Sequence, residues 1–422
     1  MSRLIRISWW GLPVLGLLIC TGLARAEGEL SWESCLAEAR KNHPDLVAAQ
    51  AVLDGIKSGL KEVNSTRLPQ LSASAGSSIG KVSGRSRNEE HSYRLSARQL
   101  LFDGFKTAND AAAQRKEISA AEYHYLVVSA NVRLNLRTAF VELLNAQEFL
   151  GVTDGILARR QQNEDIVNLQ YQVGREHKGS LLTARANTAR AACEYEQALR
   201  NVELAQIRLS RALGRDQFKS IRAQGQLDSG SADRQRPDFE LLIDSTPVLK
   251  YSLAKRESAR YALKSARSNF WPQIFFDAGA GKTGADWPAD TSDWSSGLTL
   301  SFPLFQGGAR KAALDRAKAG LQQAEAEYRV EKNGLLLTLA QAWTSWQDSL
   351  DLVDVQIKFL EASTQRSSIV GAQYTAGQAS FNEWSIIEDD LVRDQKTLLQ
   401  ARMNALIAQA AWQQAKGETL HD

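Results

Sequence analysis

The sequence of 422 residues is poor in cysteine, histidine and proline, and each scarcity excludes a class of protein. Three cysteines exclude a small fold that is held together by a disulfide framework. Five scattered histidines disfavour a histidine-built metal site, and no zinc motif, nucleophile elbow or paired-cysteine site occurs. We therefore predict no catalytic residue, no metal and no cofactor, and we do not expect an enzyme. Only 8 prolines, with abundant alanine and glutamine, favour long helices.

The first 26 residues have the pattern of an export signal. A basic start precedes an apolar stretch over 7–23, and Ala-Arg-Ala at 24–26 supplies the small residues that signal peptidase requires. We predict cleavage before Glu27. One alternative is a lipoprotein signal with Cys20 as the lipidated residue, which Ile19 disfavours because a small residue normally precedes such a cysteine. A retained membrane anchor is the other alternative.

Removal of the signal leaves a chain without net charge. Residues 1–26 contain three arginines and no acidic residue, so 51 − 3 leaves 48 Lys and Arg against 48 Asp and Glu. This balance gives no reason to expect nucleic acid as a partner.

The chain repeats itself at an offset of 203 residues. One register is kept without a gap from a proline near the start of each half to a glycine 170 residues later. The matched pairs include Pro44 with Pro247, Leu68-Pro69-Gln70 with Trp271-Pro272-Gln273, Leu101-Phe102-Asp103-Gly104 with Leu304-Phe305-Gln306-Gly307, Tyr171-Gln172-Val173-Gly174 with Tyr374-Thr375-Ala376-Gly377, and Gly214 with Gly417. We interpret this register as a tandem duplication.

Each repeat has the same predicted order: an opening helix, two strands, a very long helix and a return helix. The first repeat, 27–214, has these elements at 31–66, about 69–82, about 91–104, about 107–172 and 180–213. The second repeat, 241–416, has them at 246–269, about 272–284, about 292–304, about 310–375 and 381–416. Residues 215–240 form a linker and 417–422 a tail. A helix of about 65 residues spans roughly 100 Å, which is deeper than a globular core.

The four predicted strands indicate a membrane-spanning barrel. The stretch Leu298 to Leu304 is apolar at every second position, and strands of about 9–11 residues suffice to cross a bilayer. Strands in lipid must close into a barrel, which four strands cannot do around a useful pore, whereas three chains provide twelve. We therefore predict a homotrimer in contact with outer-membrane lipid. The alternative is a soluble hairpin that caps a helical bundle.

The stretch Gly279 to Thr283 resembles a phosphate loop, but Phe276 stands where that motif needs glycine.

These features together resemble the TolC-like outer-membrane factors of Gram-negative export systems, the outer membrane efflux protein family. The residues that carry the resemblance are the start from Trp32 to Leu46, the Leu-Pro-Gln step, the Leu-Phe-Asp-Gly turn and the paired Tyr-x-x-Gly tips. The resemblance implies a mainly α fold with a small β part. Its trimer would form a 12-strand outer-membrane β-barrel that continues as a 12-helix periplasmic α-barrel, with a collar at 215–240 and the tail.

The resemblance also implies a function and partners. The expected function is the passive outer-membrane exit duct of a tripartite multidrug or small-molecule efflux system, gated at its periplasmic tip. A periplasmic adaptor (membrane fusion) protein and an inner-membrane pump or ABC transporter would complete the system. Two alternatives remain: the outer-membrane component of type I protein secretion, and a periplasmic helical adaptor or scaffold.

Candidate gate residues follow from the family's closing tips. The resemblance assigns the constriction to Tyr374, Glu383, Gln378 and Ser180, while Ala379 stands where the family has an arginine. Three copies of Glu383 around the axis would favour the passage of cations. The simpler interpretation of Glu383 is a solvated acid at a helix N-terminus, where the helix dipole stabilises it.

The same tips are where the family docks its adaptor. The docking residues that the resemblance implies are Tyr171, Val173, Gly174, Arg175, Ala376 and Gly377. The glycines also have the simpler role of ending helices. Because Cys193 would lie near the tip and Cys35 near the collar, we expect them well over 7 Å apart and predict no intrachain disulfide.

Overall fold

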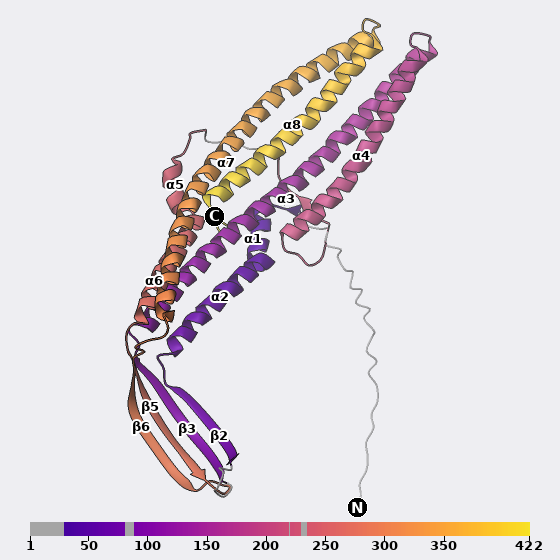
Figure 1. Cartoon of the computed structure of the whole chain (residues 1–422). Helices are drawn as coiled ribbons and strands as arrows, with labels where there is room; N and C mark the ends of the chain where they lie inside the picture. The colour runs from indigo at the N-terminus through magenta and orange to yellow at the C-terminus, as the bar shows by residue number, and fades with distance from the viewer. Residues whose placement is uncertain (1–28, 81–87, 219, 229–233) are drawn as a thin grey trace, which may run out of the picture.

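The computed structural model describes residues 29–80, 88–218, 220–228 and 234–422. Long helices form an elongated body with a small β-sheet at one end and two helical hairpins at the other (Figure 1). The predicted export signal lies outside the described residues. Among the helices of the described chain, none combines the length and the apolar character that a bilayer crossing requires.

The predicted opening helix of the first repeat is wrong as a single element. The structure has two helices, α1 (Trp32–Asn42) and α2 (Pro44–Ser65), with a break at His43. His43 has φ −64° and ψ 125°, which is extended, because a following proline disfavours the helical region for the residue before it. The ring Nδ1 of His43 accepts a hydrogen bond from the Asp45 N–H at 3.2 Å and so caps α2. Its counterpart α6 (Pro247–Ser268) is capped by Thr246.

The remaining elements follow the predicted order with shifted ends. The strands are β2 (Gln70–Gly80), β3 (Asn88–Phe102), β5 (Gln273–Gly284) and β6 (Thr291–Ser301), and the long helices are α3 (Lys106–Gln172), α4 (Lys178–Ala212), α7 (Ala309–Thr375) and α8 (Phe381–Lys416). Strand β6 ends at Ser301 and not near 304, two residues before Pro303, which has no N–H to donate to a sheet. Positions 81 and 82 of the first predicted strand lie outside the described residues.

Three short elements in and around the linker were not predicted. Strand β1 (Glu29–Leu30) pairs in parallel with β4 (Arg222–Ala223), which joins the start of the described chain to the linker. Helix α5 (Phe239–Ser245) begins before the predicted boundary of the second repeat. Arg234 of the linker forms ion pairs with Asp351 at 3.0 Å and Asp354 at 2.8 Å on α7. The linker therefore lies against the middle of the second repeat's long helix.

The sheet has the strand order β2-β3-β5-β6, and all of its pairings are antiparallel. The central pairing, β3 with β5, joins the two repeats. Residues directly opposite one another in adjacent strands share a face, and successive rows alternate between the two faces. One row reads Ala73, Leu95, Ala280, Trp294, and the next row reads Ser74, Arg94, Gly281, Asp293.

The two faces of the sheet therefore differ in polarity. The apolar face carries Leu71, Ala73, Leu95, Ala97, Phe276, Ala278, Ala280, Trp294, Leu298 and Leu300, and the polar face carries Ser72, Ser74, Ser92, Arg94, Ser96, Arg98, Asp277, Ser295 and Thr299. Among the described strands, β2 and β6 each have one edge that pairs with no other strand. Most residues of both outer strands are exposed.

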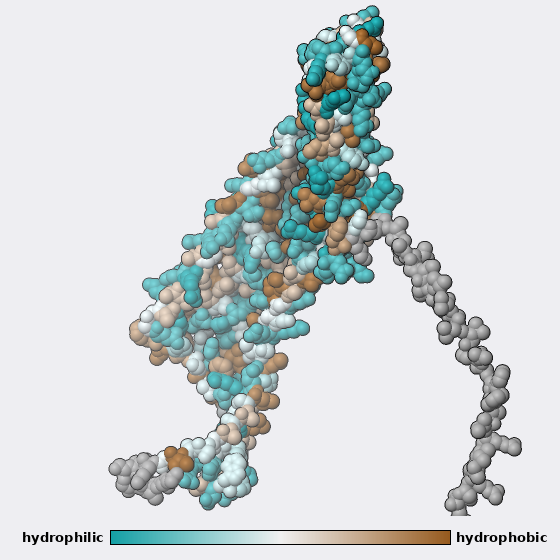
Figure 2. Space-filling view, turned by 90° about the vertical axis from the view of Figure 1, so that its right-hand side faces the viewer, coloured by the Kyte–Doolittle hydropathy of each residue, from teal (hydrophilic) through white to brown (hydrophobic). Residues whose placement is uncertain are grey.

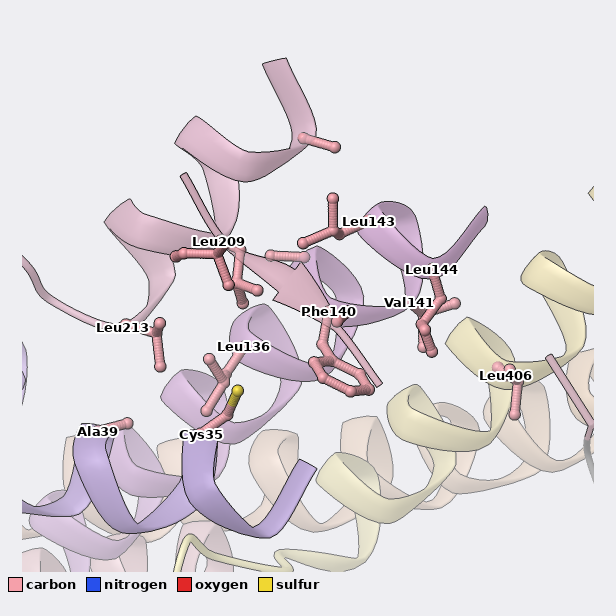
Figure 3. Close-up of a cluster of buried hydrophobic side chains, with 14 of the residues drawn as sticks. Cys35, Ala39, Leu136, Phe140, Val141, Leu143, Leu144, Leu209, Leu213 and Leu406 are labelled. Carbon is pink, nitrogen blue, oxygen red and sulfur yellow. The ribbon is translucent and has the colours of Figure 1, made fainter. Parts of the chain in front are cut away.

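Helix α3 packs against α4, α6, α2 and α8, so it connects both repeats along the body (Figure 1). Figure 3 shows the core around it, where Cys35, Leu136, Phe140 and Leu209 converge from α1, α3 and α4. Burial, and secondarily the charge of Glu38, raises the pKa of the Cys35 thiol to about 11. Cys193 is exposed, and both cysteines are free.

Apolar groups also remain on the surface of the helical body, in patches among hydrophilic ones (Figure 2). On α7, Val330, Leu337 and Phe359 are all more than half exposed, and Val47 and Val52 of α2 are similarly open. Large exposed apolar areas mark interaction surfaces more often than free ones.

Candidate functional site at the hairpin tips

The two hairpin tips are built by the same backbone motif. Gly174 follows the C-cap residue of α3 and Gly377 that of α7, with φ of +74° and +76°, a conformation that favours glycine. At the second tip, the Gly377 N–H donates to the Tyr374 carbonyl at 3.0 Å and the Gln378 N–H donates to the Gln373 carbonyl at 2.8 Å. The first tip has the equivalent bonds. This pattern is a Schellman motif, so the predicted helix-ending role of the glycines describes their local geometry.

The return helices begin with different caps. His177 caps α4, because its Nδ1 accepts a hydrogen bond from the Ser180 N–H at 3.2 Å. Ser380 caps α8, because its Oγ accepts from the Glu383 N–H at 3.2 Å. Ser180 and Glu383 therefore occupy the same helical position in the two repeats, but Glu383 is exposed and Ser180 is buried.

Tyr374 lies between the hairpins and not at their surface. It is 4% exposed, and its ring stacks on Trp384 of α8 with centroids 4.3 Å apart and an interplanar angle of 17°. Its hydroxyl donates a hydrogen bond to Glu176 Oε1, in the first-repeat tip, at 3.3 Å. Burial, and secondarily the carboxylate of Glu176, raises the pKa of Tyr374 above its ordinary value. The hydroxyl therefore keeps its proton and can donate over the whole physiological pH range.

An apolar cluster surrounds this contact and joins all four long helices. Its buried members are Val167, Leu181, Ala184, Val370, Tyr374, Trp384 and Ile387. Phe381 packs against the cluster, with its ring 6.4 Å from that of Tyr374. The cluster and the Tyr374–Glu176 bond hold the second-repeat hairpin against the first one close to the tips.

A layer of charged and polar groups lies one turn further along α8. Arg160 of α3 is 5% exposed, and its guanidinium is 2.5 Å from a carboxylate oxygen of Asp389, which Arg190 of α4 also reaches at 3.2 Å. Glu388 is 4% exposed and accepts hydrogen bonds from Asn163 at 3.3 Å and from Ser367 of α7. Each buried charge thus has a partner on another helix, as burial of a charge requires.

The predicted site residues are distributed over three environments. Tyr374 is enclosed between the hairpins, and Gln378 and Glu383 lie exposed at the second tip. The place of Ser180 in the passage stays a prediction, and in this protomer its side chain is only 2% exposed. Its Oγ lies 3.3 Å from His177 Nε2 instead, inside its own hairpin.

The predicted docking residues lie at the surface of the tips. Tyr171 is 39% exposed and Val173 is 61% exposed, and Gly174, Arg175, Ala376 and Gly377 are also exposed.

The structure adds residues that the sequence reasoning missed. Glu176, Phe381 and Trp384 form the surroundings of Tyr374, and Arg160 with Glu388 forms the charged layer. The spacing of Phe381 and Trp384, three residues apart at the start of a helix, places them on one face and could have suggested an aromatic partner for Tyr374. The described residues contain no cluster of three or more His, Cys, Asp or Glu that could hold a metal ion.

Comparisons with known proteins place this arrangement in a family. A family model described as "Outer membrane efflux protein" matches residues 35–215 and again 240–418, one match in each repeat. The outer membrane efflux protein BepC of Brucella suis biovar 1 is 21% identical over 412 residues, which cover 96% of this chain and 88% of BepC. The cation efflux system protein CusC of Escherichia coli K12 is 24% identical over 393 residues, which cover 87% and 82%.

Solved structures share the fold. A crystal structure of CusC superposes with a TM-score of 0.83 at 21% identity and covers 91% of each chain. The outer membrane channel MtrE of Neisseria gonorrhoeae, in its open state, has a TM-score of 0.80 at 19% identity and covers 91% of this chain and 88% of MtrE. The chain belongs to the outer membrane efflux protein family, whose members are outer-membrane channels with a large periplasmic part and not enzymes.

Proposed function

We propose that this efflux channel is the exit duct of a tripartite small-molecule efflux system, which opens and closes at its periplasmic tips. The observation that carries the proposal is the sheet, which has one apolar face, one polar face and two free edges among the described strands. A strand edge in lipid leaves backbone groups without partners, so such a sheet requires further copies to close it. The apolar face would then contact lipid and the polar face would line water.

Three copies satisfy this requirement. They supply twelve strands, an even number in the range of known barrels, and the helices α3, α4, α7 and α8 supply twelve helices below them. The exposed apolar residues of α7 and α2 support the same assembly, because neighbouring protomers would cover them. We therefore propose a homotrimer whose helices enclose a periplasmic tunnel.

The tips provide a closing device in this proposal. Tyr374 and Glu176 link the two hairpins of one protomer, and the tips would have to separate for the tunnel to widen. Ala379 offers no charge to this contact, so the closed state depends on the tyrosine, the apolar cluster and the charged layer around Arg160. Glu383 and Gln378, both exposed at the second tip, would face the narrowest part of the passage.

The tips would also dock a periplasmic adaptor that connects the duct to an inner-membrane pump or ABC transporter. Val173 is at the first tip, and 61% of its apolar side chain is exposed. It lies outside the buried apolar cluster near the tips, so the packing of the protomer does not depend on it. The names of the relatives BepC and CusC both refer to efflux, which favours efflux over protein secretion for this chain.

Electrophoresis without heating and planar-bilayer recording test the duct together. We expect a heat-sensitive trimer in the outer-membrane fraction and discrete conductance from the purified protein.

Val173→Arg with Ala376→Arg tests docking, because both side chains are exposed and neither position needs a positive φ. Substitution of Gly174 or Gly377 is less informative, since side chains at their φ strain the turn.

The docking variant should form normal trimers with normal conductance but lose export in cells. A monomer without conductance would refute the duct itself, and normal export by the variant would refute the docking site alone.

A further inference from the structure

A lysine stands on the apolar face of the sheet, near its end away from the helices. Lys282 of β5 pairs directly with Tyr93 of β3 and with Ser292 of β6, so it shares the face of Leu95 and Trp294. Its side chain is exposed. If this face contacts lipid, as in the proposed function on which this inference rests, a cation at that place requires an explanation.

Two arginines on the opposite face of the sheet each form an ion pair with an aspartate. Arg94 lies 2.5 Å from Asp293 across the strands, and Arg98 lies 3.4 Å from Asp277. Lys282 forms no ion pair with any residue that the structure describes. The acid of the same face, Glu89, lies four residues beyond Tyr93 along β3.

Aromatic side chains frame the lysine. The indole of Trp287, in the loop between β5 and β6, packs edge-on against Tyr93 with ring centroids 5.4 Å apart. The Tyr93 hydroxyl donates to the Ala289 carbonyl at 3.4 Å, which holds that loop over the apolar face. Trp287 and Trp294 are 67% and 80% exposed. Exposed tryptophans at a strand end are typical of the depth at which lipid headgroups begin.

We propose that Lys282, framed by Tyr93, Trp287 and Trp294, binds the phosphate of a phosphorylated lipid in the outer leaflet. A lysine at this depth extends its ammonium toward the headgroups while its methylene stem stays in the apolar layer. The ammonium then meets a phosphate as a charge-assisted partner, and the tryptophans contact the first part of the acyl chains. No carboxylate lies opposite the lysine to compete for it.

Lipid retention tests the site. The full-length trimer is reconstituted into phosphatidylcholine vesicles with and without phosphatidic acid, extracted in mild detergent, and its retained lipids are quantified by mass spectrometry. We expect phosphatidic acid to be enriched in the wild type and in Lys282→Arg. Lys282→Gln should lower the enrichment about fivefold, the factor that corresponds to about 1 kcal/mol per lysine at a charged membrane surface. Lys311→Gln, an equal charge change at the start of α7, should leave it unchanged.

Three results would overturn the site: equal enrichment in Lys282→Gln and the wild type, an equal loss in Lys311→Gln, or full displacement by excess inorganic phosphate, which would indicate a site for a free anion. Single-channel conductance is recorded from the same vesicles. Failed enrichment in a conducting trimer rejects the lipid site alone, whereas a protein without conductance rejects the proposed function.

Discussion

Removal of the Tyr374 hydroxyl should open the channel. In the structure this hydroxyl donates to Glu176 across the two hairpins at 3.3 Å, while the ring itself stacks on Trp384. Tyr374→Phe deletes the hydrogen bond and keeps the stacked ring. In the proposed function the hairpins separate when the tip widens, so the substitution should raise the energy of the closed state and leave the open state unchanged.

The magnitude follows from the bond and the number of copies. A hydrogen bond to a charged group contributes about 1.5–3 kcal/mol, and this one is long and its acceptor is half-buried, so about 1 kcal/mol is a reasonable value. In the proposed trimer three such bonds would break together, for about 3 kcal/mol in total. At 1.36 kcal/mol per factor of ten, the open-to-closed ratio should rise about 100-fold.

Neutral pH is the correct condition for this test. Burial raises the pKa of Tyr374 above its ordinary value, so the folded protein holds the proton more tightly than the unfolded chain does. A raised pKa in the folded state gives a contribution that is fully present below the ordinary tyrosine pKa of about 10 and is lost at higher pH. The contact should therefore be constant from pH 5 to about 9 and weaken only above that range.

Single-channel recording in planar bilayers measures the open probability. Tyr171→Phe is the matched control, because Tyr171 occupies the equivalent position of the first repeat but is 39% exposed and lies outside the buried cluster. Glu176→Gln should reproduce part of the effect and add little to Tyr374→Phe. An open probability within twofold of the wild type, or an equal increase in Tyr171→Phe, would show that this contact does not hold the tip closed.

Three further predictions concern selectivity, stability and reactivity. Glu383→Gln should shift the reversal potential in a KCl gradient toward lower cation preference, and unchanged selectivity would remove Glu383 from the constriction. Arg160→Met leaves Asp389 with only Arg190 as an ion-pair partner and should destabilise the packing of the hairpins by about 2 kcal/mol, which hydrogen exchange near the tips would detect as a faster rate. Arg185→Met breaks an exposed ion pair and should cost under about 1 kcal/mol. At pH 8 an alkylating reagent should modify Cys193 at least about 100-fold faster than Cys35, because Cys35 is buried with a pKa of about 11; equal labelling in peptide mapping would contradict that burial.

The order of long elements could be predicted from the sequence because local signals determine it. Proline-free stretches with apolar residues at steps of three and four give α3 and α7, and the glycines after Tyr171 and Tyr374 give the tips. The break at His43 was missed although Pro44 marks it, since the apolar pattern continues across the proline. The early end of β6 was missed for the same reason: alternation continues past Ser301, but Pro303 cannot pair.

The tip could be predicted only in part, because its chemistry comes from contacts between distant segments. Tyr374 and Glu176 are 198 positions apart, and no local pattern relates them. Arg160 and Asp389 are 229 positions apart, and each looks like an ordinary surface charge of a long helix. The resemblance to the family assigned Ser180 to the constriction, whereas in the protomer its side chain is buried in the packing of its own hairpin.

The difference between the two repeats explains why only one tyrosine is buried. At the offset of 203, Trp384 and Phe381 of the second repeat correspond to Leu181 and Lys178 of the first. The first repeat therefore has no aromatic surface on which Tyr171 could stack. Glu176 corresponds to Ala379, so only the first repeat carries the acceptor, whereas both repeats carry a tyrosine at the donor position.

A duplication that remained symmetric would place two identical hairpins at the tips, with no contact that distinguishes one from the other. Here the acceptor Glu176 is on the first hairpin and the buried donor Tyr374 is on the second, so this bond joins the two repeats. The charged layer has the same property, because Arg160 corresponds to Ser363 and Asp389 corresponds to Ala186. Divergence at these positions gave the two hairpins different residues, and through these residues they hold each other near the tips, as the proposed closing of the tip requires.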